Sequence, residues 1–182
     1  MVVYYCQKMQ PTDSNNPDDM VTHASEHVRR MLAAAAPTRE ILTRLATAGE
    51  HLAGPGSAVS ILLLDDKGLL RNGASPNLPS DYLRAIDRLK PDPLVGTCAA
   101  AAATGCPVIT PDFLADDKWS ELRHLPMSLG YVGAWSMPIK SEDGKILGTF
   151  GTYYRQRRAP TAEEKEGVEL LATAAALALA RV

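Results

Sequence analysis

The feature that most constrains the fold of this chain is a pair of similar polar turns between β-like segments. Residues 65–68 (Asp-Asp-Lys-Gly) and 141–144 (Ser-Glu-Asp-Gly) both end in glycine and are both flanked by apolar stretches. Short polar turns of this composition connect antiparallel strands. The strands expected beside the two turns are 58–64, 69–74, 131–140 and 145–155. The sequence therefore predicts two β-hairpins.

Helical patterns lie on both sides of this pair. We expect one helix over residues 26–36 and a second that restarts at Pro37-Thr38 and ends near residue 52. Thr161 and Glu164 have the spacing of a capping box, in which each side chain bonds the other's backbone N–H. This motif predicts a final helix that continues to the end of the chain.

The segment between the hairpins has mixed patterns. We expect short helices over 82–89 and 97–104, a short strand over 108–110, and a helix over 117–129 that is interrupted at Pro126. This order of elements predicts an α+β fold with a central antiparallel sheet. The terminal helices cover one face of the sheet, and the helix and loop segment 76–130 forms a pocket on the other.

Charge, length and cysteine content exclude several classes of protein. The net charge is −2 and the basic residues are scattered, so we expect no nucleic-acid partner. The longest apolar run near the C-terminus, 170–180, is too short to cross a bilayer, so we expect no membrane insertion. Cys6, Cys98 and Cys106 form no disulfide or zinc pattern, and the first residues lack signal-peptide features. The sequence therefore predicts a cytoplasmic protein.

The middle and end of the chain resemble the GAF domain family. The motifs that carry the resemblance are, in order, 94–98 (Leu-Val-Gly-Thr-Cys), 104–109 (Thr-Gly-Cys-Pro-Val-Ile), 116–119 (Asp-Asp-Lys-Trp), 135–139 (Trp-Ser-Met-Pro-Ile), 143–150 (Asp-Gly-Lys-Ile-Leu-Gly-Thr-Phe) and 153–164. The likeness covers residues 37–182. One departure is Ala99, where many relatives have glycine, and an alanine run there narrows the cavity or stiffens the helix.

The resemblance implies a GAF-like domain over 26–182, after a polar and irregular lead-in over 1–25. Similar domains occur in bacterial sensor histidine kinases, diguanylate cyclases and free-standing receptors. We therefore expect a sensory module of a two-component system that binds a small molecule and is not itself an enzyme. Its output partner is a kinase or cyclase. The sequence identifies no cofactor.

The best local candidate for ligand binding is Gly96-Thr97-Cys98, which precedes a predicted helix. Free N–H groups and the helix dipole at such a position favour an anion or a polar ligand group. Some free-standing GAF proteins of this kind resemble nitrate receptors, so a small oxyanion is one expected ligand. The alternative is an ordinary helix cap in which the Thr97 hydroxyl serves the free N–H groups.

Aromatic residues are few, and four of them fall where the resemblance places the wall of a GAF pocket. Strand alternation puts Thr149 and Tyr153 on one face of their strand, with glycine between them. The alternative for each aromatic residue is ordinary core packing. The predicted ligand-binding residues are Val95, Gly96, Thr97, Cys98, Phe113, Trp119, Trp135, Thr149 and Tyr153.

Two other chemistries are weighed. Some GAF domains reduce free methionine sulfoxide with cysteines, but residues 124–136 lack the further cysteine that those enzymes carry, so an enzyme is the weaker hypothesis. His23, Glu26 and His27 match a short zinc motif without a third ligand, and His124 is better explained as a surface residue than as a haem ligand. We therefore expect no metal site.

The final helix is apolar on more than one side. Leu170, Leu171, Ala174 and Leu177 together exceed what packing on a single sheet requires. This surplus predicts a homodimer built on the terminal helices. It also leaves open a second hypothesis, in which the chain is a dimerisation or protein-interaction module whose pocket is filled by its own side chains.

Overall fold

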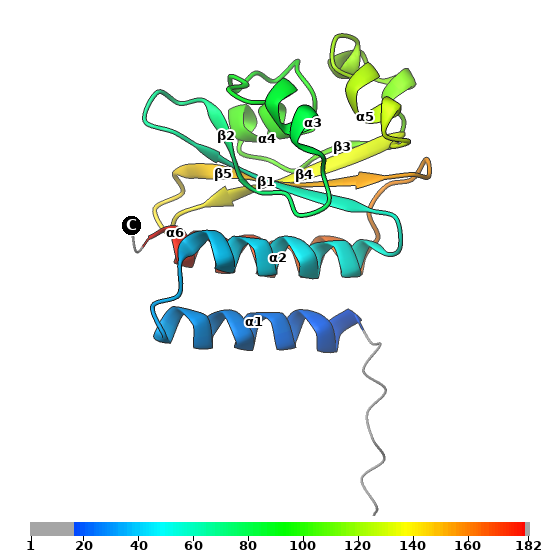
Figure 1. Ribbon diagram of the computed structural model, residues 1–182. Helices are drawn as coiled ribbons and strands as arrows, with labels where there is room; N and C mark the ends of the chain where they lie inside the picture. Colours follow the sequence, from blue (N-terminus) through cyan, green and yellow to red (C-terminus); the bar gives the residue numbers. More distant parts are fainter. Residues whose placement is uncertain (1–16, 181–182) are drawn as a thin grey trace, which may run out of the picture.

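The computed structural model describes residues 17–180 (Figure 1). The elements in chain order are α1 (Pro17–Ala33), α2 (Thr38–Ala53), β1 (Ala58–Leu64), β2 (Leu70–Ala74), α3 (Ser80–Ala85), α4 (Thr97–Thr104), β3 (Val108–Thr110), the 3₁₀ turns η1 (Phe113–Ala115) and η2 (Asp117–Trp119), α5 (His124–Ser128), β4 (Gly133–Lys140), β5 (Ile146–Tyr154) and α6 (Ala162–Leu179). No helix in this part of the chain combines the length and apolar character needed to cross a membrane.

The strands form one antiparallel sheet in the order β2-β1-β5-β4-β3. The two expected hairpins, β1–β2 and β4–β5, are joined because β1 pairs with β5, which makes β5 the central strand. The layers are clear in Figure 1: helices lie below the sheet, and shorter helices and loops lie above it. The predicted α+β arrangement is confirmed.

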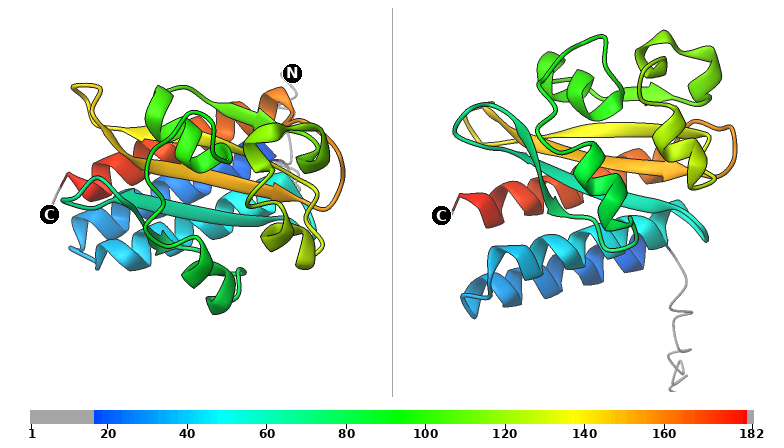
Figure 2. Two further views of the ribbon diagram at one scale, coloured as in Figure 1. Left: turned by 90° about the horizontal axis from the view of Figure 1, so that it is seen from above. Right: turned by 45° about the horizontal axis from the view of Figure 1, so that its top comes forward.

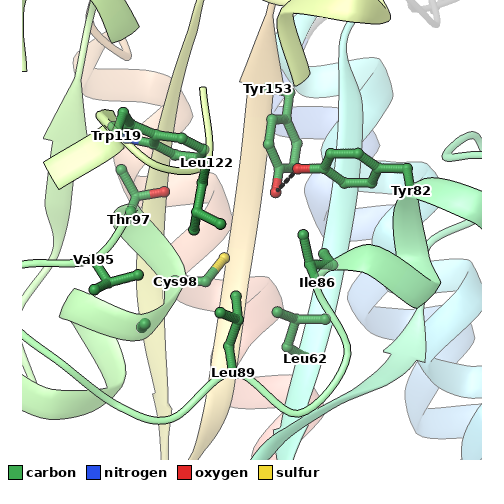
Figure 3. Close-up of a pocket in the computed structure, with 12 residues that line it drawn as sticks. Leu62, Tyr82, Ile86, Leu89, Val95, Thr97, Cys98, Trp119, Leu122 and Tyr153 are labelled. Carbon is green, nitrogen blue, oxygen red and sulfur yellow. Dashed lines mark hydrogen bonds between the residues drawn. The ribbon is translucent and has the colours of Figure 1, made fainter. Parts of the chain in front are cut away.

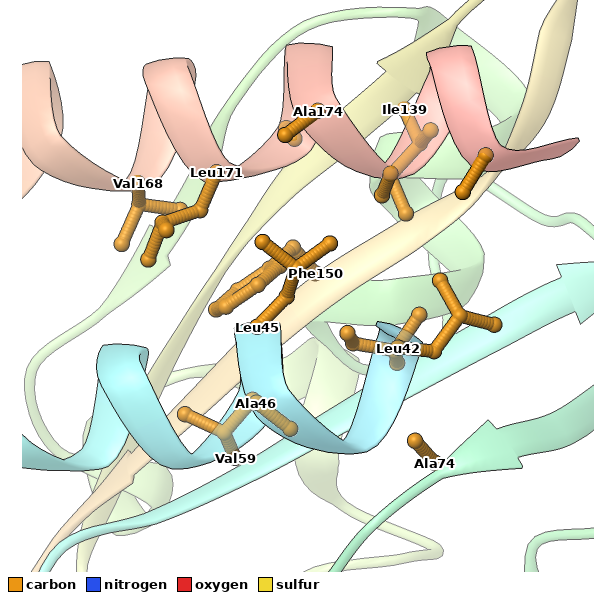
Figure 4. Close-up of a cluster of buried hydrophobic side chains, with 14 of the residues drawn as sticks. Leu42, Leu45, Ala46, Val59, Ala74, Ile139, Phe150, Val168, Leu171 and Ala174 are labelled. Carbon is orange, nitrogen blue, oxygen red and sulfur yellow. The ribbon is translucent and has the colours of Figure 1, made fainter. Parts of the chain in front are cut away.

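The lower face of the sheet holds the larger apolar core. Helices α2 and α6 pack on the sheet, and α1 packs against both of them on the outer side. Phe150 of β5 lies at the centre of this core and is fully buried. The side chains drawn around it include Leu42, Leu45, Ala46, Val59, Val168, Leu171 and Ala174 (Figure 4).

A polar cluster joins the first turn of α6 to the sheet and to α2. The capping box is present, since the Glu164 N–H donates to Thr161 Oγ1 at 3.1 Å and the Thr161 N–H donates to Glu164 Oε2 at 2.7 Å. Arg158 donates to both Glu164 oxygens at 2.6 and 2.8 Å and to the Ala53 carbonyl at 2.9 Å. The Tyr154 hydroxyl donates to Glu164 at 3.1 Å. One carboxylate therefore connects β5, α2 and α6.

Two expected boundaries were wrong. Helix α1 begins at Pro17, so residues 17–25 are not an irregular lead-in; residues 1–16 lie outside the described part. The helix starts with proline at its first position and acidic residues in its first turn, which suit a helix N-terminus. Further along, 117–129 is not one helix but the turn η2 and the short helix α5. Pro126 is accommodated because it lies in the first turn of α5, where no backbone N–H bond is lost.

The buried Glu164 predicts how stability depends on pH. Burial alone would raise the pKa of Glu164, but its hydrogen bonds with Arg158 and with the Thr161 backbone outweigh burial and hold the pKa below its usual range. A lowered pKa in the folded state stabilises the protein above the unfolded-state pKa, and this contribution is lost as the pH falls through the folded-state value. In urea titrations at pH 7, Glu164→Gln is expected to lower the free energy of unfolding by about 3 kcal/mol.

The same variant is expected to lose less stability than the wild type when the pH is lowered from about 5 to about 3. Glu121→Gln, at an exposed position outside the terminal helices, is the matched control and is expected to follow the wild type. Parallel pH profiles for Glu164→Gln and the wild type would show that Arg158 does not perturb this carboxyl group.

Candidate functional site

The upper face of the sheet encloses a small cavity beneath α3, α4 and η2 (Figure 3). Figure 2 shows these short elements lying over the strands. The cavity volume is about 20 Å³, which is room for about one water-sized group. The lining residues are Leu62, Tyr82, Ile86, Leu89, Val95, Gly96, Thr97, Cys98, Ala99, Trp119, Leu122 and Tyr153.

Gly96 places the start of α4 against the turn that carries Trp119. Its φ is +53°, a conformation that favours glycine, and its N–H donates to the Lys118 carbonyl at 2.7 Å. A Cβ atom at this position would lie 3.7 Å from the Trp119 ring. That distance is an ordinary van der Waals contact, so the backbone conformation, and not lack of space, favours glycine here.

Asp116 fixes the shape of the same turn. It accepts hydrogen bonds from the Thr110 hydroxyl at 2.6 Å and from the Lys118 N–H at 3.1 Å, and the Lys118 ammonium lies 2.8 Å away. The Trp119 ring then packs on Phe113, with 4.2 Å between ring centroids. The Asp-rich turn therefore holds the indole at the cavity.

A buried chain of small polar groups lies below the cavity. The Ser136 hydroxyl of β4 donates to Thr97 Oγ1 at 2.9 Å, and Cys98 Sγ lies 3.1 Å from Ser136 Oγ. The Thr97 side chain makes no helix-cap hydrogen bond, so the cap expected from the sequence is wrong. Thr97 is the first residue of α4 rather than the residue before it, and its hydroxyl faces the sheet instead.

Cys98 is a buried thiol rather than an activated nucleophile. Burial raises the pKa of its thiol, and neighbouring hydroxyl groups only partly oppose this. A helix N-terminus lowers a cysteine pKa, but here loss of solvation is the larger effect. The thiol is therefore protonated near neutral pH.

Two tyrosines form the opposite side of the cavity. The Tyr82 hydroxyl of α3 donates to the Tyr153 hydroxyl of β5 at 3.0 Å, and the rings meet edge to face with centroids 5.9 Å apart. Burial raises the pKa of both phenols above the ordinary value, so both keep their protons. This pair connects α3 to the central strand.

The structure brings most of the predicted site residues together. Six of them line the cavity: Val95, Gly96, Thr97, Cys98, Trp119 and Tyr153. Phe113 lies behind Trp119, and Thr149 is buried on the same face of β5 as Tyr153 without lining the cavity. Whether these residues bind a ligand stays a prediction.

Trp135 was placed on the wrong side of the sheet. It pairs across the strands with Thr152, whereas Ala134 pairs with Tyr153, and directly paired residues share a face. Trp135 therefore packs with Phe150 in the core between the sheet and the helices, and Tyr153 faces the cavity. The sequence showed the alternation within each strand but not the register between strands.

Tyr82, Ile86 and Leu89 were missed as cavity residues. They recur at intervals of four and three in the segment that was expected to be a short helix. This spacing fits one face of the expected helix 82–89, but α3 ends at Ala85, so Ile86 and Leu89 reach the cavity from the segment that follows the helix. The apolar stripe was available in the sequence, but nothing indicated that it faced the candidate pocket.

The residues weighed as metal or haem ligands do not gather. His23 and His27 are exposed on α1, and His124 is exposed at the start of α5. Within residues 17–180 no group of three His, Cys, Asp or Glu side chains is placed to hold a metal ion.

Comparison with known proteins assigns the family. The family model described as "GAF domain" matches residues 35–180. The chain belongs to the GAF domain family. A relative, the methyl sulfide methyltransferase-associated sensor of Methanosarcina acetivorans, is 32% identical over 160 residues, which are 87% of this chain. This GAF domain spans only 16% of that relative's length.

Solved structures agree on the fold. The GAF domain from a phosphoenolpyruvate-protein phosphotransferase of Coxiella burnetii has a TM-score of 0.75 at 20% identity, covering 93% of this chain and 96% of that one. Free methionine-R-sulfoxide reductase of Neisseria meningitidis, solved with its substrate, has a TM-score of 0.69 at 16% identity, covering 95% and 94%. At such identities the likeness shows the fold alone.

The close approach of α4 to the sheet is testable at Gly151 of β5. A Cβ atom there would lie 2.8 Å from Cys98 Sγ and 3.3 Å from Ser136 Oγ. Gly151→Ala is therefore expected to lower the free energy of unfolding by about 1–3 kcal/mol in urea denaturation, because the added methyl group overpacks the site.

Cys98→Ala removes the sulfur that the new methyl group meets. The double variant is therefore expected to cost less than the sum of the two single variants. If the losses of unfolding free energy are additive, the methyl group at position 151 does not meet the Cys98 sulfur, and other contacts hold α4 against β5.

Proposed function

We propose that this GAF domain is a cytoplasmic sensory module that binds a small molecule in the cavity above the sheet and reports it through the terminal helices. The observation that carries the proposal is the position of the cavity, which is walled by Tyr153 one residue from Tyr154. Tyr154 points to the opposite face and bonds Glu164 in the first turn of α6. In this proposal, a movement of the cavity wall at Tyr153 is transmitted through Tyr154 to the terminal helix α6.

The relative from Methanosarcina acetivorans supports a sensory role, since that protein is named as a sensor. In the proposed arrangement the domain acts in a two-component system and its output partner is a kinase or cyclase. A ligand shifts the helices only if it binds one arrangement of the cavity wall better than another.

An enzymatic role is the weaker alternative. A sulfoxide-reducing cysteine must be a thiolate to attack its substrate. The buried Cys98 has a raised pKa, and Cys106 is exposed and does not line the cavity. The shared fold with a reductase carries no argument about activity at 16% identity.

Ligand binding is tested by native mass spectrometry of the purified protein, followed by denaturation and identification of any released molecule. Leu89→Phe adds bulk to the cavity wall, so it is expected to abolish the mass increment or the thermal shift that a panel of small molecules produces. Leu114→Phe, at a leucine that is 53% exposed and outside the cavity, is the matched control.

The opposite outcome is equally informative. A wild-type protein that carries no ligand and shows no thermal shift with small neutral molecules or small oxyanions would favour the interaction-module hypothesis. A Leu89→Phe protein that binds as well as the wild type would place the site elsewhere.

We also propose that the domain forms a homodimer through its terminal helices. Leu170 and Leu177 of α6 are 57% and 48% exposed, and they lie on one outer stripe with Glu166. Burying such leucines against a second copy removes apolar surface from water. This stripe provides the apolar contact for dimerisation.

A groove between α1 and α2 has the complementary charge. Arg30 and Arg44 line it, and its other lining residues are His23, Ala24, His27, Thr47, Ala48 and His51, so none is acidic. The exposed side of α6 carries Glu163, Glu166 and Glu169. Opposite charges set orientation and specificity at an interface. In the proposed dimer, α6 of each copy lies in the α1–α2 groove of the other.

The dimer is tested by light scattering at tens of micromolar protein. Leu170→Ser/Leu177→Ser is expected to convert a dimer mass to a monomer mass. Arg30→Glu/Arg44→Glu is expected to weaken the dimer, and combination with Glu166→Arg/Glu169→Arg is expected to restore it.

Leu94→Ser is the matched control, because Leu94 is 75% exposed and lies outside the terminal helices. A wild-type protein that is strictly monomeric would refute the dimer. Loss of the dimer on charge reversal without restoration would refute the α6-in-groove arrangement alone.

A further inference from the structure

The tyrosine pair at the cavity has one proton without a partner. Each phenol carries one O–H, and the hydrogen bond between Tyr82 and Tyr153 uses one of the two. Tyr153 is 3% exposed, so bulk solvent does not reach the remaining O–H, and the cavity that it faces has room for about one water-sized group. Among residues 17–180 no acceptor is recorded for the Tyr153 proton. A buried donor without a partner costs free energy comparable to a lost hydrogen bond.

This free donor faces the cavity. Figure 3 shows the hydroxyls of Tyr82 and Tyr153 meeting near Leu122, Cys98 and Ile86, all of which line the same space. Because the raised pKa values keep both phenols protonated, the Tyr153 O–H is available as a hydrogen-bond donor.

The remaining lining is mainly apolar and carries no charge. Leucine, isoleucine and valine side chains make up much of the wall, and no Arg, Lys, Asp or Glu is among the lining residues. An ion in such a space loses its hydration without gaining a counter-charge. The lining therefore disfavours the small oxyanion that the sequence resemblance suggested.

We propose that the ligand is a small, neutral, mainly apolar molecule with a hydrogen-bond acceptor, such as a carbonyl oxygen, which accepts from Tyr153. The inference rests on the proposed function, since it names the chemical class of ligand for that cavity. At about 20 Å³ the cavity holds about one water-sized group, so a ligand of this class enters only when the cavity wall moves. Size and one hydrogen bond set the specificity.

The experiment uses three probes of nearly the same shape: acetone, acetate and 2-methylpropene. They present a neutral acceptor, an anionic acceptor and no acceptor. Binding is followed by chemical-shift changes of the Cys98 and Ala99 amides in the wild type and in Leu122→Ala, which enlarges the cavity. Acetone is expected to bind more tightly than 2-methylpropene, and acetate is expected to bind least.

Tyrosine variants assign the donor. Tyr82→Phe keeps the Tyr153 hydroxyl and is therefore expected to keep the preference for acetone over 2-methylpropene, even where the affinities for both probes change. Tyr82→Phe/Tyr153→Phe removes both hydroxyls and is expected to weaken acetone binding about three- to tenfold, while 2-methylpropene binding is unchanged. A fold check by urea denaturation accompanies each variant.

The outcomes separate the two proposals. If acetate binds as well as acetone, or if the double variant does not change the preference for acetone over 2-methylpropene, the ligand chemistry is wrong while the cavity remains a binding site. If no probe binds even to Leu122→Ala, the cavity is not a ligand site, and the proposed function fails together with this inference.

Discussion

The alternation of side chains along β5 is the constraint on which both faces of this domain depend. Neighbouring residues of a strand point to opposite faces of the sheet. Tyr153 therefore faces the cavity while Tyr154 faces the helices, and both are almost fully buried. Because β5 pairs with both β1 and β4, neither tyrosine moves without displacing the centre of the sheet.

The polar cluster at the end of β5 gives this strand its connection to the helices. Tyr154 and Arg158 both bond Glu164, and the Arg158 guanidinium also lies 3.8 Å from the centroid of the Tyr154 ring. A buried charge is costly without its partner, so this carboxylate and guanidinium are expected to move together. Arg158 also bonds the Ala53 carbonyl at the end of α2. The start of α6 and the end of α2 thus share a single anchor beside the cavity strand.

Local sequence signals predicted most of the helices and strands. Contacts between segments that are distant in the sequence were not predicted. The strand over 58–64, the helix over 97–104 and the capping box at Thr161 were all predicted, because turn residues and helix caps act within a few positions. Trp135 was assigned to the wrong face, since the register between β4 and β5 depends on the whole sheet. Arg158 lies beyond the predicted strand 145–155 without a local signal of its partner, and its pairing with Glu164 is visible only in three dimensions.

The small size of the cavity follows from the alanines of α4. Side chains no larger than a methyl group let the helix approach the sheet, and Gly151 makes room for Cys98 at the contact. Helix α4, which begins in the motif at residues 94–98, therefore fills the space above the sheet rather than enclosing a large pocket. The remaining space is bounded by larger side chains from α3, from the loop that follows it and from Leu122. In the proposed ligand site, selection by size depends on these segments, whereas selection by the hydrogen bond depends on β5, the strand that also contacts the helices.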